Sequence, residues 1–259
     1  MPTVPVLLLL VVASALAGFL DAAVGGGGLI TIPALMLALP GQPVTTILGT
    51  NKIVASTGTS FAAARFLRSG VLRWQEMVVP VLMAMAGASA GVSLAYFLQG
   101  HFEPHMRAGM LVLMIAVLTF VLVRPELGRL HAPRFGLSHQ RLAAAVISLV
   151  IGFYDGFFGP GTGTLLVFCF VAVLGFDFLR ASALTKSVNW ASNVASLVLF
   201  VARGSWLPVV ALGMALGNGL GGYLGARTAL AKGSAWLRTV FIVVVGALTL
   251  RLGWQMLRG

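Results

Sequence analysis

The chain has 259 residues, of which 59% are hydrophobic and only 9% are charged, and its formal net charge is +11. A soluble domain usually has about a quarter of its residues charged, so this composition excludes a soluble globular protein. The arginines lie in short loops between apolar segments rather than on one basic face, which argues against a nucleic-acid partner and is typical of membrane proteins. Long alternating strand patterns are absent. The composition therefore predicts an all-α polytopic membrane protein.

Apolar segments follow one another along the whole chain. Those of the first half are 4–20, 28–39, 44–66, 76–98 and 105–123. Those of the second half are 141–154, 164–175, 180–202, 206–226 and 237–257. The second segment of each half is the shortest, and a helix of about twelve residues covers only about 18 Å of a hydrocarbon core roughly 30 Å thick. The first two segments of each half therefore form either a re-entrant hairpin or two short broken spans.

The two halves are copies of one unit. The motif GFLD at 18–21, which precedes a glycine cluster at 25–28, recurs as GFYD at 152–155 before a second cluster at 159–163. The same offset places Lys52 on Lys186, which makes a chance match improbable in a chain so poor in charge.

Loop charge indicates that the two copies insert in opposite directions. Arg65, Arg68 and Arg73 follow the third segment of the first half, whereas Arg203 is the basic residue of the matching loop. Positive loops face the cytoplasm, so the two loops lie on opposite sides of the membrane. We expect two inverted repeats, 1–130 and 131–259. Each has a broken or re-entrant glycine-rich hairpin plus three spanning helices.

Four charged residues are expected at membrane depth: Asp21, Asp155, Lys52 and Lys186. Charges within a membrane are costly and mark either pathways or mutual pairs. One interpretation is a pair of structural ion pairs that hold the broken segments in place. The other is that the lysines attract an anion while an aspartate takes up and releases a proton, which makes the two aspartates candidates for proton coupling.

The two glycine clusters, at 25–28 and 159–163, interrupt the helices, because glycine and proline are costly in a helix interior. Each interruption leaves free N–H groups at the start of the next half-helix, where the positive dipole end favours an anion. The alternative is a tight turn that allows close packing. The residues expected to cradle an anion here are Gly26, Gly27, Gly161 and Thr162.

Small polar residues accompany both lysines. Asn189 and Asn193 share one helix face with Ser192 and Ser196, and such side chains either donate to an oxyanion or join membrane helices. The binding candidates in these segments are Thr50, Asn51, Lys52, Thr185, Lys186, Asn189 and Asn193.

A seam of small residues, Gly213, Gly217, Gly221 and Gly225, repeats at every fourth position. It predicts close packing against a neighbouring helix or, in a homodimer, against a second protomer. All four histidines lie in loops or at their edges, and no serine nucleophile, P-loop lysine or metal-ligand spacing appears. We therefore expect no enzyme activity, no metal and no cofactor.

These motifs resemble a known family. GFLDAAVGGGG at 18–28, with Pro33 and GTNK at 49–52, is similar to the first-half signature of the TauE/SafE family of sulfite exporters. GFYDGFFGPGTGTLL at 152–166, with the ALTK and Asn segment at 183–193, is similar to the second-half signature. The first motif departs slightly, with four consecutive glycines. The resemblance covers nearly the whole chain and implies a multi-pass permease of the bacterial inner membrane for sulfur-containing anions.

Together, the residues and the resemblance predict a secondary transporter of sulfite or an organosulfonate such as sulfoacetate, with export as the favoured direction. Its partners would be the anion, the lipid bilayer and, if it is coupled, protons. An anion channel, an importer and a non-transporting scaffold are the alternatives. The symmetric breaks favour a carrier, since a channel needs one continuous polar lining.

Overall fold

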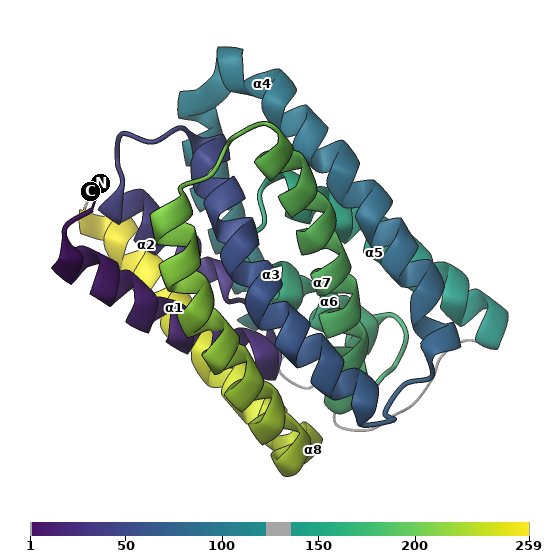
Figure 1. The fold of residues 1–259 in the computed structure, drawn as a ribbon. Helices are drawn as coiled ribbons and strands as arrows, with labels where there is room; N and C mark the ends of the chain where they lie inside the picture. Colours follow the sequence, from purple (N-terminus) through teal and green to yellow (C-terminus); the bar gives the residue numbers. More distant parts are fainter. Residues whose placement is uncertain (1, 123–135, 259) are drawn as a thin grey trace.

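The computed structural model describes residues 2–122 and 136–258, and in this part of the chain it contains eight helices and no strand (Figure 1). This confirms the prediction of an all-helical protein. The expected boundary between the halves, at 130 and 131, lies outside the described residues. The helices are α1 (Val4–Val24), α2 (Gly28–Ala38), α3 (Val44–Arg68), α4 (Trp74–Leu122), α5 (Leu137–Phe157), α6 (Thr162–Ala172), α7 (Phe178–Ala202) and α8 (Pro208–Arg258).

Helix lengths repeat between the halves. The helices α1 and α5 have 21 residues each, α2 and α6 have 11, and α3 and α7 have 25. The last helices, α4 and α8, have 49 and 51 residues. Each takes in two of the predicted segments, and α8 is kinked at Gly233, where φ is 74° and ψ is −170°.

Four helical stretches in the described residues are long and apolar enough to cross a membrane: Val4–Ala23, Trp74–Gln99, Ser138–Phe157 and Pro208–Gly233. The helices α2 and α6 are only about 16 Å long, which is too short to span the hydrocarbon core. The helices α3 and α7, with 25 residues each, are long enough to span the membrane, but they contain too many polar residues to be counted among these four apolar stretches. They can tolerate this polarity because most of their surface is buried against other helices.

The helices α3 and α7 lie side by side and run in opposite directions (Figure 1). Near the start of α3, Thr50 Oγ1 accepts a hydrogen bond of 3.0 Å from the N–H of Leu207, which follows α7. At the other end, Arg180 in the first turn of α7 pairs with Glu76, which follows α3. The loops after these two matching helices therefore lie at opposite ends of the bundle.

The small-residue seam of α8 packs against α1. A Cβ atom added at Gly221 would lie 2.0 Å from the carbonyl oxygen of Ala15, and one at Gly225 would lie 2.3 Å from that of Phe19. The first helix of the second half, α5, packs in the same way on α4, where Gly91 faces the carbonyl oxygen of Phe153. The packing role predicted for the seam is confirmed. The α8 face that the sequence offered to a second protomer is covered by α1 of the same chain.

Candidate functional site

Each half contains a chain reversal at its glycine cluster. The helix α1 ends at Val24, and Gly25 and Gly26 follow with φ of 86° and 96°. After α5, Gly159 and Gly161 have φ of 87° and 78°. Residues with a Cβ rarely adopt these angles, so glycine is what allows α2 and α6 to start where they do.

The two reversals lie against each other. A Cβ atom at Gly25 would be 2.3 Å from the carbonyl carbon of Gly163, and one at Gly163 would be 2.9 Å from the Cα atom of Gly25. Only two glycines allow the backbones to approach this closely. The contact brings the N-terminal ends of α2 and α6, one from each half, to a single place in the molecule.

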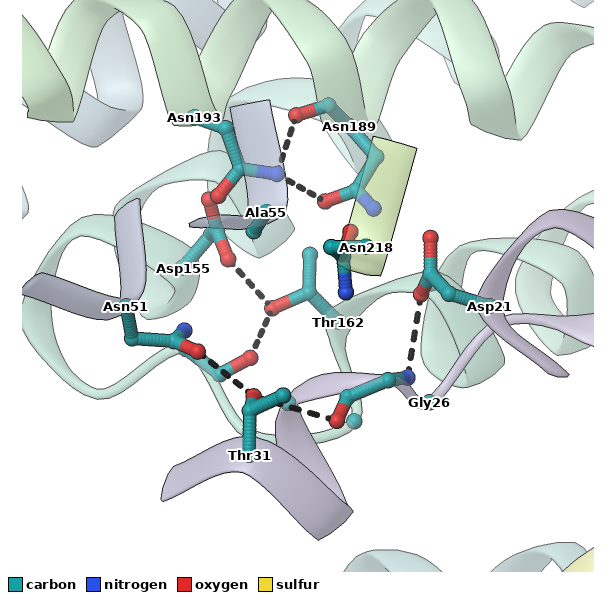
Figure 2. A pocket seen from close by; sticks show the side chains of 15 residues that line it. Asp21, Gly26, Thr31, Asn51, Ala55, Asp155, Thr162, Asn189, Asn193 and Asn218 are labelled. Atoms are coloured by element: carbon teal, nitrogen blue, oxygen red, sulfur yellow. Dashed lines mark hydrogen bonds between the residues drawn. The ribbon is translucent and has the colours of Figure 1, made fainter. Parts of the chain in front are cut away.

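A cavity lies where the reversals meet α3, α7 and α8 (Figure 2). Its free volume is about 20 Å³, enough for about one water molecule. It is lined by Asp21, Gly26, Gly27, Gly28, Thr31, Asn51, Ala55, Asp155, Gly159, Gly161, Thr162, Gly163, Asn189, Asn193 and Asn218. All four asparagines of the chain are in this lining.

Most residues proposed from the sequence are brought together here. Those in the lining are Asp21, Gly26, Gly27, Asn51, Asp155, Gly161, Thr162, Asn189 and Asn193. Those outside it are Thr50, Lys52, Thr185 and Lys186. The hydroxyl of Thr50 donates to the carbonyl oxygen of Thr46 and accepts from Leu207, so it closes one end of α3. Thr185 is completely buried away from the cavity.

Three lining side chains were missed by the sequence analysis: Thr31, Ala55 and Asn218. Thr31 Oγ1 lies 2.5 Å from Oδ1 of Asn51, so it orients a residue that was proposed. Asn218 follows Gly217 of the small-residue seam in α8, and its Nδ2 donates to the carbonyl oxygen of Ser14. An amide within a run of glycines was the available signal for it.

Lys52 forms an ion pair with the aspartate of the other half. Its Nζ lies 2.7 Å from Oδ2 of Asp155, and both side chains are 2% exposed. Oδ1 of Asp155 accepts a hydrogen bond of 2.7 Å from the hydroxyl of Thr162, the first residue of α6. The carboxylate is therefore held between an ammonium group and the positive end of a half-helix.

Lys186, of the second half, makes the corresponding contacts with Asp21 of the first half. Its Nζ donates to the main-chain oxygen of Asp21 and lies 3.7 Å from Oδ2 of the same residue. Oδ1 of Asp21 accepts a hydrogen bond of 3.1 Å from the N–H of Gly27, at the start of α2. Both lysines thus lie behind the aspartates, and the aspartates face the cavity.

The positive and negative groups around the cavity balance one another. Two half-helix ends, amide groups and two ammonium groups converge, and two carboxylates offset their positive charge. In the described part of the chain, no group of three or more His, Cys, Asp or Glu side chains is placed to hold a metal ion.

Residues 10–252 match the family described as Sulfite exporter TauE/SafE. The chain belongs to this family. Relatives of this TauE/SafE chain include "Probable membrane transporter protein ORF9" of Sinorhizobium sp, which is 38% identical over 247 residues, covering 94% of this chain and 90% of the relative. "Probable membrane transporter protein YfcA" of Escherichia coli strain K12 is 34% identical over 239 residues, covering 92% and 86%.

A third relative, "Probable membrane transporter protein" of Haemophilus influenzae, is 35% identical over 248 residues, covering 92% of each chain. No solved structure matches this chain. The family, the names of the relatives and the apolar helices together identify a multi-pass membrane transporter.

Proposed function

We propose that this TauE/SafE protein is a secondary carrier of the bacterial inner membrane that exports a small sulfur-containing anion, sulfite or an organosulfonate such as sulfoacetate, with coupling to protons. The observation that carries the proposal is the cavity between the two chain reversals. It gathers one half-helix end from each half and all of the chain's asparagines. Broken helices that meet in this way form the substrate sites of many carriers built from inverted repeats.

Charge balance is the argument for proton coupling. Asp155 neutralises Lys52 and faces the N-terminus of α6, so an anion that enters the cavity meets a negative group. Protonation of Asp155 would leave the ammonium and the helix end without a counter-charge. An anion in the cavity would then supply the missing negative charge. Proton and anion would therefore bind together, each raising the affinity for the other.

The size of the cavity is the argument for a carrier over a channel. Free space for about one water molecule does not admit a sulfonate, so in this conformation the described residues around the cavity leave no passage for one there. The substrate has to enter a conformation in which the reversals have separated. Two inverted halves can exchange such states on the two sides of the membrane, which is alternating access.

The test is transport by the purified protein in liposomes. Uptake or efflux of sulfite, thiosulfate, sulfoacetate, taurine and sulfate would be measured with and without an imposed pH gradient. The proposal expects saturable flux of a sulfur-containing anion that a pH gradient drives uphill. Flux that rises linearly with concentration and ignores the gradient would indicate a channel. Flux no greater than that of empty liposomes would indicate a scaffold.

Vesicles of defined orientation then test the direction. Because proton and anion cross together in this proposal, the physiological proton gradient, acidic outside, opposes export, and the anion's own concentration gradient has to drive it. Export predicts that inside-out vesicles take up the anion down its own gradient and that their lumen becomes more acidic. Accumulation only in right-side-out vesicles would make the protein an importer.

A further inference from the structure

Three side chains form a hydrogen-bonded series from the ion pair to the cavity. Lys52 Nζ donates to Oδ1 of Asn193 over 3.1 Å. Asn193 Nδ2 in turn donates to the main-chain oxygen and to Oδ1 of Asn189, over 2.8 Å and 3.2 Å. All three residues are buried.

The chemistry of the first group fixes the orientation of the others. An ammonium group donates and cannot accept, so Asn193 must present its oxygen to Lys52. The amide nitrogen of Asn193 then faces Asn189, which must present its own oxygen. The remaining end of the series is Nδ2 of Asn189, which carries two N–H groups.

This nitrogen has no acceptor among the described residues. In Figure 2 it points away from Asn193, toward the part of the cavity beside Asn218. Asn189 is only 4% exposed. Its N–H groups are open to the cavity, so an acceptor placed there, on a ligand or on a water molecule, can pair with them.

We infer that Asn189 makes the site selective for oxyanions whose oxygens are all acceptors, and that Lys52 and Asn193 are positioning residues that hold its amide in the donating orientation. The inference rests on the proposed function, because it takes the cavity as the substrate site. A sulfonate group presents only acceptor oxygens. An oxyanion of the same charge that retains an O–H group would place a donor against the N–H groups of Asn189 whenever that oxygen faces them.

Methanesulfonate and singly protonated methylphosphonate are a matched pair of probes, because they have the same shape and charge and differ by one O–H group. Their dissociation constants would be measured by titration calorimetry on the whole protein in lipid nanodiscs, at a pH where methylphosphonate carries one proton. The parent protein should prefer methanesulfonate by about tenfold or more, the cost of one unmatched polar contact.

Two variants test the residues. Asn189→Asp replaces the donor with an acceptor, so it should weaken methanesulfonate binding by about 10- to 100-fold and reverse the preference toward methylphosphonate. Asn193→Asp still accepts from Lys52 but no longer donates to Asn189. The amide of Asn189 is then free to turn, so the ratio of the two dissociation constants, which favours methanesulfonate in the parent, should move closer to one. Ser196→Ala, on the same helix but outside the lining, is the control and should leave the preference at the parent value.

The outcomes separate the inference from the proposed function. If the parent binds both probes equally, the inference is overturned while an anion site remains. If Asn189→Asp weakens both probes by the same factor, Asn189 is structural and the inference is again overturned. If the parent binds neither probe, the cavity is no sulfonate site, and the inference falls together with the organosulfonate form of the proposed function.

Discussion

Lys52 of the first half lies 2.7 Å from the carboxylate of Asp155 in the second half, and Lys186 of the second half faces Asp21 in the first. Each lysine is thus paired across the boundary between the halves, and none of these contacts joins residues of the same half. The two crossed pairs fasten the halves together at the chain reversals that form the cavity. Any motion that separates α3 from the end of α5, or α7 from the end of α1, must stretch or exchange these pairs.

The first prediction concerns the stability of the two pairs. Lys52→Met leaves Asp155 as an uncompensated buried charge and should lower the free energy of unfolding by about 3–5 kcal/mol. Asp21→Asn should cost less, because Lys186 keeps its hydrogen bond to the main-chain oxygen of Asp21. Denaturant unfolding in detergent micelles measures both changes.

The control for this prediction is the double variant Lys52→Met/Asp155→Leu, which removes both charges. Most of the lost stability should return, because no buried charge then lacks a partner. A double variant that is no more stable than Lys52→Met would mean that the cost comes from lost packing rather than from the charge.

The second prediction concerns the proton. In Asp155→Asn the side chain is uncharged at every pH, so it imitates the protonated form of the aspartate. In the parent, proton coupling predicts that anion binding strengthens as the pH falls. In the variant, the affinity for the anion should be the same at every pH and equal to that of the parent at low pH. A pH gradient should no longer drive transport. Anion exchange across liposomes should persist.

Glu76→Gln is the matched control, since Glu76 pairs with Arg180 near the end of the bundle and lies outside the cavity. It should retain transport driven by the gradient. If Asp155→Asn responds to the gradient as the parent does, Asp155 carries no coupled proton.

The sequence predicted the helices and their breaks because these depend on local chemistry. Hydropathy marks the apolar segments, and glycines at 25–28 and 159–163 mark the places where helices stop. The repeated motifs also allowed residues far apart in the chain to be aligned. Helix lengths that repeat between the halves agree with that alignment.

The sequence could not predict which lysine meets which aspartate. Lys52 is 31 residues from Asp21 and 103 from Asp155 along the chain, yet it pairs with the more distant one. That choice follows from how the halves pack. The lysines were also expected to reach the anion directly, whereas the structure places them behind the aspartates. Thr50 illustrates the same limit, because its role at the end of α3 depends on Leu207 in the other half.

The third prediction concerns the seam between α1 and α8. A Cβ atom at Gly221 would lie 2.0 Å from the carbonyl oxygen of Ala15, so Gly221→Ala must push the helices apart and should cost about 1–3 kcal/mol. Gly213→Ala is the control on the same seam. Its Cβ atom would lie 3.5 Å from a methyl carbon of Leu7, an ordinary contact. It should be neutral or slightly stabilising, because alanine favours a helix. Equal melting temperatures for the two variants would contradict this packing.

The last prediction tests the inverted orientation of the halves. Gly70 follows α3 and Gly204 follows α7, and both have positive φ, with no other atom within 4 Å of an added Cβ. Cysteine at either position therefore carries the same modest strain and is equally open to reagents, so the two sites can be compared directly. The native Cys169 would first be replaced by alanine.

A membrane-impermeant maleimide would then be applied to intact cells and to permeabilised cells. The arginines at 65, 68 and 73 favour a cytoplasmic position for Gly70, so Gly70→Cys should react only after permeabilisation. Gly204→Cys should react in intact cells, because its loop leaves the opposite end of the bundle (Figure 1). Reaction of both cysteines from the same side would rule out inverted repeats. It would also remove the symmetry that alternating access at this cavity requires, since the two halves could no longer exchange roles across the membrane.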